Sequence, residues 1–377
     1  MIQITRPDLT FDEVADDLRQ ILASGRLTDG PVLARFESAL SNIIGAPHVV
    51  ATTSATTALH LSLVALGIGP GDEVLVSDFS FPASANAIVQ CGAVPVFVDC
   101  RQDGFDLDLV DAGKRVSART RAIMPVHPFG MPADIVAISQ LASKHGLLII
   151  EDAACALGAS REGISCGNGG NTGCFSFHPR KLVTTGEGGA IATTDEELSA
   201  RLRLLRSHGA KPSVVGQEFL ENGFNYRLSE ISASLGLAQL HRFAPMIDDR
   251  RRTAQAYQNA LSNFEDILMP QFGSPGFGTF QSFVVLLGDH VDRNHVVKEM
   301  RARKVETTLG TYAQHSQPAF ARFGCLPGDL PHSLRAQRQS LTLPLLPHMG
   351  MEPVHYVVDA LVASIHASYR NPSDETV

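Results

Sequence analysis

One lysine in this chain stands where its amine could do chemistry. Lys181 follows an aromatic-rich run at residues 174–177 and precedes a glycine turn at residues 186–189. Beside aromatic rings and a tight glycine loop, a lysine amine can lose its proton and attack a carbonyl as a Schiff-base nucleophile. Glycine clusters often mark turns alone, so a surface lysine beside a turn is the alternative.

A carboxylate precedes this lysine at the end of an apolar run. Residues 147–150 are apolar and lead into Glu151 and Asp152, the pattern of a buried strand with an acid at its carboxyl end. That edge of an open α/β sheet is where ligands bind. A carboxylate there suits the pyridine nitrogen of pyridoxal phosphate, which must stay protonated for the ring to withdraw electrons. A helix cap or a metal ligand would give the same local pattern.

A third feature suits a phosphate group. Small hydroxyl residues at 53–57 lead into the almost wholly apolar segment 58–66, which predicts a buried helix. The free backbone N–H groups and the dipole at the amino end of a helix both favour an anion. Simple capping of the helix by Ser54 or Thr56 is the alternative.

Two longer phrases resemble those of a known family. Residues 151–159 read Glu-Asp-Ala-Ala-Cys-Ala-Leu-Gly-Ala, and residues 175–189 read Phe-Ser-Phe-His-Pro-Arg-Lys-Leu-Val-Thr-Thr-Gly-Glu-Gly-Gly. They resemble motifs of the DegT/DnrJ/EryC1/StrS family of sugar aminotransferases, and the resemblance extends from Arg6 to about Pro344. It implies an α/β chain of the fold-type I pyridoxal phosphate transferases. We expect a large domain with a mostly parallel central sheet at residues 1–245 and a smaller C-terminal α/β domain at 246–377.

The resemblance also implies roles for individual residues around the cofactor. Lys181 would carry pyridoxal 5'-phosphate and Asp152 would face its pyridine nitrogen. The other implied cofactor contacts are Ser54, Ala55, Thr56 and Ser176 at the phosphate, Phe81 against the ring, and Asn225 reaching the phosphate from a neighbouring subunit. Cys155 departs from the family, which commonly has Gln or His there to contact the ring oxygen. Because a thiol is a weak hydrogen-bond partner, that contact is expected to be weaker or replaced.

Four further residues are candidates for the substrate side. Arg227 offers a rigid fork of donors for an anionic group, although a salt bridge within a subunit interface is the alternative. Tyr312 and His315 align loosely with the substrate-side segment of the family, and His127 is expected to support the site. The contribution of Asn225 to a neighbouring subunit implies a homodimer with shared active sites.

Composition excludes several other classes of protein. The chain has 377 residues, a net charge of −8 and no basic tract, which argues against nucleic-acid and membrane-surface partners. Its six cysteines form no Cys-x-x-Cys pair, so neither a metal site nor a disulfide framework is expected. No signal pattern and no apolar stretch of membrane-spanning length occurs, so we expect a cytoplasmic protein.

The expected reaction transfers an amino group from an amino acid, usually L-glutamate in the resembled family, to a keto group on a nucleotide-linked sugar. A sugar dehydratase of the same family is an alternative, but those enzymes commonly have histidine where this chain has Lys181. The acceptor could also be a cyclitol or another ketone of specialised metabolism. A cysteine hydrolase built from Cys155, His127 and Asp152 is a remote alternative, because these residues have no local signature of that chemistry.

The periodicity of the sequence predicts the elements that would position these residues. We expect helices over residues 12–24, 58–66 and 292–303, and over 231–261 with a break or kink at Pro245. We expect strands over residues 48–51, 71–77, 94–99, 121–127, 147–150 and 282–286.

Overall fold

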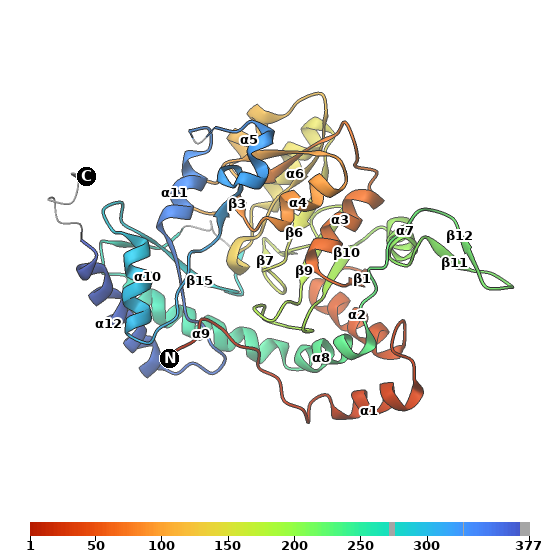
Figure 1. Cartoon of the computed structure of the whole chain (residues 1–377), viewed down its shortest axis with the longest axis horizontal. Helices are drawn as coiled ribbons and strands as arrows, with labels where there is room; N and C mark the ends of the chain where they lie inside the picture. The colour runs from red at the N-terminus through yellow and green to blue at the C-terminus, as the bar shows by residue number, and fades with distance from the viewer. Residues whose placement is uncertain (271–275, 327, 370–377) are drawn as a thin grey trace.

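A seven-stranded sheet forms the centre of the larger part of the chain in the computed structural model, which describes residues 1–270, 276–326 and 328–369 (Figure 1). The strand order is β1-β10-β9-β6-β5-β2-β4, and β10 alone of these strands runs antiparallel to its neighbours. The predicted α/β fold with a mostly parallel sheet is therefore confirmed. The strands are β1 (His48–Thr52), β2 (Glu73–Ser77), β4 (Val94–Val98), β5 (Thr120–Met124), β6 (Leu148–Asp152), β9 (Thr172–Ser176) and β10 (Gly189–Thr193).

Helices cover both faces of this sheet. Successive side chains of a strand point to opposite faces, and in these strands the side chains on both faces are largely apolar. On one face, Val50, Val76 and Ile150 pack against α3 (Ala55–Ala65), α4 (Ala83–Gln90) and α7 (Glu196–Arg206). On the other face, α2 (Pro31–Ile44) and α8 (Glu230–Leu240) cover β1, β9 and β10. Next to them, α5 (Leu109–Arg115) and α6 (Ile135–His145) cover β2, β5 and β6.

The predicted helices agree with the structure to within a few residues. α1 (Ala15–Ser24) ends at Gly25, whose φ of 68° is the left-handed conformation that glycine adopts readily. The break expected near Pro245 separates α8 from α9 (Phe243–Leu261), and the proline lies in the first turn of α9, where no N–H donor is needed. Helix α2 was not predicted from the sequence.

A second, smaller core lies toward the C-terminus. The sheet β13-β15-β17, made of β13 (Ile267–Leu268), β15 (Phe283–Leu287) and β17 (Ser340–Leu343), packs with α9, α10 (Arg293–Ala302) and α12 (Met351–Ala367). The segment between α10 and β17 crosses back to the large sheet, where Phe320 and Leu330 join the core around α3 and α4. We keep the division between residues 245 and 246 as a proposal; residues 370–377 lie outside the described part.

No helix in the described ranges combines the length and the apolar character that crossing a membrane requires. All six cysteines are free thiols. The described residues contain no group of three or more His, Cys, Asp or Glu side chains placed to hold a metal ion.

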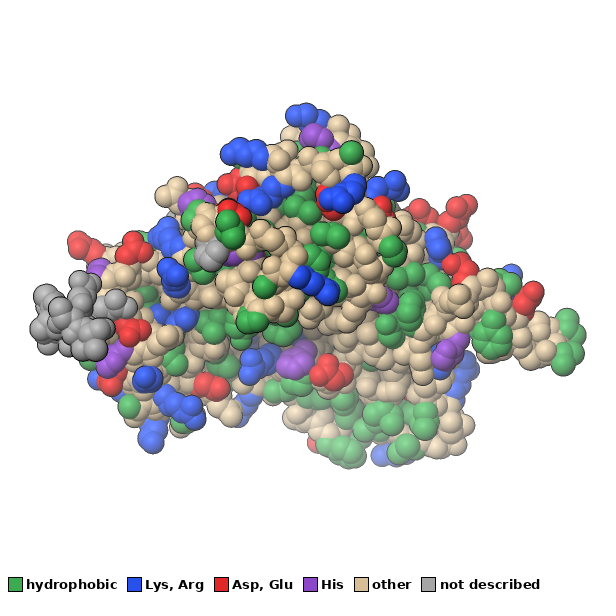
Figure 2. Space-filling model, turned by 45° about the horizontal axis from the view of Figure 1, so that its top comes forward, with side chains coloured by type: hydrophobic (Ala, Val, Ile, Leu, Met, Phe, Trp, Pro, Cys, Tyr) green, Lys and Arg blue, Asp and Glu red, His purple; other side chains and the backbone are tan. Residues whose placement is uncertain are grey.

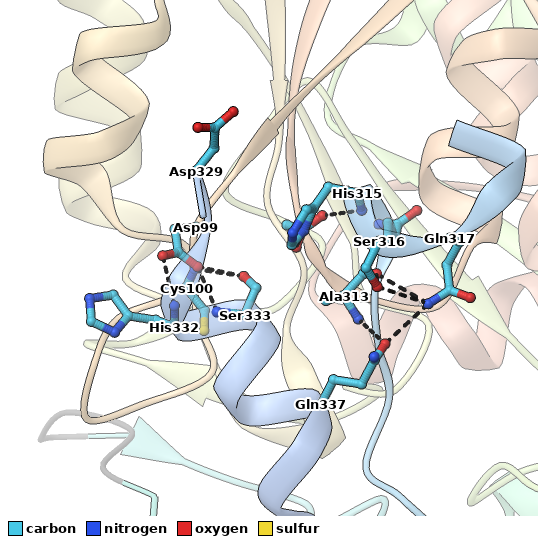
Figure 3. A network of polar contacts seen from close by, with 12 residues as sticks. Asp99, Cys100, Ala313, His315, Ser316, Gln317, Asp329, His332, Ser333 and Gln337 are labelled. Atoms are coloured by element: carbon cyan, nitrogen blue, oxygen red, sulfur yellow. Dashed lines mark hydrogen bonds and ion pairs between the residues drawn. The ribbon is translucent and has the colours of Figure 1, made fainter. Parts of the chain in front are cut away.

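The returning segment is fastened to the large sheet at Asp99, just after β4 (Figure 3). Its carboxylate accepts hydrogen bonds from the backbone N–H of His332 at 3.0 Å and from both the N–H and the hydroxyl of Ser333, at 2.7 and 2.6 Å. These residues begin α11 (Pro331–Gln339), which has no capping side chain of its own. Asp99 therefore caps a helix that begins at Pro331, 232 residues later in the chain.

We expect Asp99→Ala to lower the free energy of unfolding by about 3 kcal/mol, because it strips a buried helix end of its acceptor. Chemical denaturation followed by circular dichroism would measure the change. Asp103→Ala is the control, since that carboxylate is 58% exposed in its ion pair with Arg101 and should cost less than about 1 kcal/mol. Equal losses in the two variants would contradict the capping role.

Candidate active site

The register of four neighbouring strands brings the predicted phosphate and ring residues to one edge of the sheet. Thr52 pairs with Gly189, and Gly189 pairs with Ser176 across β1, β10 and β9. Asp152 pairs with Cys174 of β9. The end of β1, which leads to Ser54, therefore lies on the same edge as Ser176 and Asp152.

Asp152 is a buried carboxylate held by neutral donors. It is 6% exposed, and its Oδ2 accepts a hydrogen bond from the hydroxyl of Ser84 at 2.7 Å while Oδ1 accepts one from the N–H of Ala154 at 3.1 Å. Within the described residues, no lysine, arginine or histidine forms an ion pair with it. A buried carboxylate without a cation is costly, so this position suits a positively charged partner such as a pyridinium nitrogen. Sequence reasoning missed Ser84, since a serine near the start of a helix has no distinctive signature.

The amino end of α3 has the features of a phosphate site. Ser54 caps the helix by accepting the N–H of Thr57 at 3.1 Å, so the capping role considered for Ser54 is present. Ala55 is buried, while Thr56 and Ser176 remain partly accessible. A Cβ added at Gly189 would lie 2.4 Å from the carbonyl carbon and oxygen of Ser54. Glycine is therefore needed for β10 to approach the start of this helix so closely.

Lys181 and Cys155 face each other. The Nζ of Lys181 lies 2.9 Å from Sγ of Cys155, and both residues are half-buried. Cys155 follows Asp152 on the loop after β6, so the thiol links the predicted catalytic amine to the strand that carries the predicted catalytic acid. The residue at which this chain departs from the resembled family is thus in direct contact with the lysine.

Phe81 and Tyr312 are brought together by a two-residue bridge. β3 (Phe79–Ser80) pairs with β16 (Tyr312–Ala313), with Tyr312 opposite Ser80. The Phe81 side chain is 66% exposed and Tyr312 is 37% exposed. Accessible aromatic rings beside the sheet edge suit the ring-facing and substrate-side positions predicted for them.

The two predicted histidines are both buried and paired with acids. Nε2 of His127 lies 2.8 Å from Glu151, and its Nδ1 accepts the N–H of Ala133 at 3.0 Å, which leaves no ring nitrogen free for a substrate. Nδ1 of His315 lies 2.6 Å from Asp78, and its Nε2 has no hydrogen-bond partner in the described part of the chain. Burial raises the pKa of the Asp78 carboxyl, and the hydrogen bond from His315 opposes that rise.

Glu151 organises the face of the strand opposite to Asp152. Besides His127 it accepts the backbone N–H groups of Gly167, Gly169 and Gly170 at 2.9, 2.7 and 2.8 Å. Nothing in the sequence pointed to a role for this residue. Because His127 is engaged here and Cys155 contacts Lys181, the structure does not assemble the cysteine hydrolase considered from the sequence.

Asn225 and Arg227 follow the hairpin of β11 (Ala210–Pro212) and β12 (Gln217–Phe219). Asn225 is exposed. Nη1 of Arg227 donates to the Ser207 hydroxyl at 2.9 Å, and its Nε lies 3.7 Å from Asp29, so part of its fork is engaged within the subunit. The intervening Tyr226 accepts the N–H of Thr53 through its carbonyl at 3.0 Å. This segment therefore borders the phosphate loop of its own chain.

A lysine amine, an unpaired buried carboxylate and a helix amino end along one edge of this sheet suit a pyridoxal phosphate-dependent enzyme of fold type I, and comparison with known proteins assigns the chain to that class. The chain matches the DegT/DnrJ/EryC1/StrS aminotransferase family over residues 10–362. It is 38% identical over 339 residues to GDP-perosamine synthase of Caulobacter vibrioides, covering 89% of this chain and 90% of that protein.

Solved structures agree with this assignment. DesV of S. venezuelae is 34% identical, with a TM-score of 0.89 and coverage of 96% of this chain and 95% of DesV. The PMP-form of the putative sugar aminotransferase Spr1654 from Streptococcus pneumoniae is 25% identical, with a TM-score of 0.92 and coverage of 97% and 99%. The chain belongs to the DegT/DnrJ/EryC1/StrS family of sugar aminotransferases, which depend on pyridoxal phosphate.

Proposed function

We propose that this enzyme transfers an amino group from L-glutamate to a keto group on a nucleotide-linked sugar. The proposal is supported by the placement of Lys181 against Cys155, on the loop that follows Asp152, because the amine can move a proton and the carboxylate provides a fixed negative charge nearby in the chain. The similarity to GDP-perosamine synthase supports a nucleotide-linked acceptor. Lysine at 181 favours amino transfer over the dehydratase alternative.

Each residue would have a separable task. Pyridoxal phosphate supplies an electron sink that stabilises negative charge at the carbon losing a proton. The Lys181 amine would accept that proton and donate it again, serving as both base and acid. Asp152 holds the positive charge of the pyridine nitrogen. Ser54 and its neighbouring N–H groups would hold the phosphate, and Phe81 would lie against the ring.

We further propose a homodimer in which Asn225 and Arg227 serve the partner's site. Large apolar side chains are exposed at the tip of the projecting β11–β12 hairpin, where Val214 is 103% and Val215 90% exposed (Figure 2). Exposed apolar clusters of this kind mark interaction surfaces, and a second copy of the same chain gives closed two-fold symmetry. The alternative is that Asn225 and Arg227 contribute to the active site of their own subunit, because Tyr226 between them bonds Thr53 of the same chain.

Lys181→Ala should remain folded and abolish amino transfer, because the phosphate and ring contacts come from other residues while the proton carrier is lost. Activity with L-glutamate and an acceptor sugar would be measured beside circular dichroism. Lys144→Ala, which removes an exposed lysine of α6, is the control and should match the parent. Turnover near the parental rate in Lys181→Ala would remove this residue from its role.

The acceptor class is tested by single-turnover reactions. The enzyme is first loaded with an amino group from L-glutamate and then offered GDP-, UDP- and dTDP-linked keto-hexoses or a cyclitol ketone, with products followed by mass spectrometry. We expect at least one nucleotide-linked sugar to react about tenfold faster or more than the cyclitol, because an acceptor site that bonds a nucleotide would leave those bonding groups unpaired with a cyclitol. A faster cyclitol reaction would support a specialised-metabolite ketone instead.

Subunit complementation tests the shared sites. Lys181→Ala subunits are mixed with Asn225→Ala/Arg227→Ala subunits, each inactive alone, and the exchanged heterodimers are isolated. If the sites are shared, one site of the heterodimer carries both defects and the other neither, so activity returns to about half the parental level. Inactive heterodimers, alongside parental subunits that survive the same exchange, would contradict the sharing.

A further inference from the structure

The peptide that carries Lys181 is held from both sides by one buried side chain. Gln281 donates its Nε2–H to the carbonyl of Arg180 at 2.5 Å and accepts the N–H of Leu182 through Oε1 at 2.8 Å. A primary amide has the donor and acceptor needed to bond the backbone on either side of a residue, in the manner of a neighbouring strand. Lys181 lies in a loop outside any helix or strand, so this contact supplies order that secondary structure does not.

Gln281 is itself fixed in place. It is 7% exposed, and Arg250 of α9 donates to its carbonyl at 2.9 Å and to the carbonyl of Phe280 at 3.2 Å. Burial lowers the pKa of Arg250 to about 10, so the guanidinium still carries its charge at neutral pH. A Cβ at Gly130 would lie 2.5 Å from the backbone nitrogen of Gln281. The backbone of Gln281 is therefore packed closely against Gly130 as well.

A second glutamine holds the same loop in the same manner, three residues further on. Gln239 of α8 donates to the carbonyl of Thr184 at 2.7 Å and accepts its N–H at 3.1 Å. Gln239 is 1% exposed. Each side chain donates one bond to the loop and accepts one from it, but Gln239 bonds the N–H and carbonyl of the single residue Thr184 and also donates to the Leu235 carbonyl at 2.6 Å, whereas the bonds of Gln281 flank the lysine.

We propose that Gln281 is a positioning residue that fixes the backbone of Lys181 so that its amine reaches the reacting carbon. The proposal rests on the proposed function of Lys181. Reacting atoms must be held close to their productive geometry, and a displacement of about 1 Å costs on the order of a hundredfold in rate. An amide that grips the peptide on both sides of the lysine limits such displacement while leaving the amine free.

The test compares Gln281→Met with Gln239→Met, each of which removes one donated and one accepted hydrogen bond from the same loop. Apoprotein is mixed with pyridoxal phosphate, reduced with borohydride at timed intervals, and the label on the Lys181 peptide is quantified by mass spectrometry. We expect the rate of labelling and kcat to fall roughly tenfold or more for Gln281→Met, and less than about twofold for Gln239→Met. Both variants should lower the melting temperature, and Gln239→Met should lower it at least as much as Gln281→Met, since the Thr184 groups left unpaired are buried while those of Arg180 and Leu182 are only part-buried. Equal rates of labelling in the two variants would overturn the proposal.

Gln281→Glu gives a second measurement if the methionine variant does not fold. It keeps the acceptor for Leu182 and loses the donor to Arg180, so its labelling rate should lie between those of the parent and the methionine variant. A parental rate in Gln281→Glu would contradict the need for a grip on both sides.

A double-mutant cycle separates this proposal from the proposed function. In a Lys181→Ala background, Gln281→Met should leave noncovalent affinity for pyridoxal phosphate unchanged, because the glutamine acts through the lysine. A weakened affinity there would show general support of the site and overturn the proposal. Absence of label on Lys181 in the parental protein would instead contradict the proposed function.

Discussion

The register of β6 against its neighbours is the constraint on which the rest of the site depends. Successive side chains of a strand point to opposite faces, and a shift of one residue would exchange Asp152 with Glu151. The two acids are committed differently. Glu151 is enclosed by His127 and three glycine N–H groups, whereas Asp152 has two neutral donors and no cation among the described side chains. The correct register is therefore also the one in which the unpaired carboxylate faces the sheet edge.

The C-terminal part of the chain returns to brace this edge at three places. Gln281 forms hydrogen bonds to the loop that carries Lys181, Tyr312 pairs with Ser80 as a short strand, and Ser333 donates a hydrogen bond to Asp99. Each contact joins segments at least about one hundred residues apart in sequence. Loops carry the reacting groups, and loops lack the regular hydrogen bonds that fix strands. Side-chain contacts from a second packed unit supply what the loops lack.

The sequence predicted what contiguous residues determine. Apolar runs and glycine stops predicted β1, β2, β4, β5, β6 and α1, and the residues around Lys181 and Asp152 indicated the family, but β9 and β10 of the central sheet were not predicted. Helix α2 was not predicted because a Gly-Pro pair such as Gly30-Pro31 is typical of a turn, although proline also begins helices. The roles of Ser84, Asp99 and Gln281 were not predicted because the partners of these residues are distant in the chain. His127 was placed near the site, but both its ring nitrogens serve buried partners.

The contrast between the lysine's backbone and its amine explains why a thiol fits at position 155. The backbone on either side of Lys181 is held by short bonds to a rigid amide, while the amine meets only Cys155 among the hydrogen-bond partners found for it in the described chain. A carboxylate there would form a partly buried ion pair, and breaking one leaves an uncompensated charge. A cysteine sulfur is a weak hydrogen-bond partner that the amine can leave at little cost. A rigidly held backbone and a weakly bound amine together suit a lysine that must both bond to a cofactor and carry a proton.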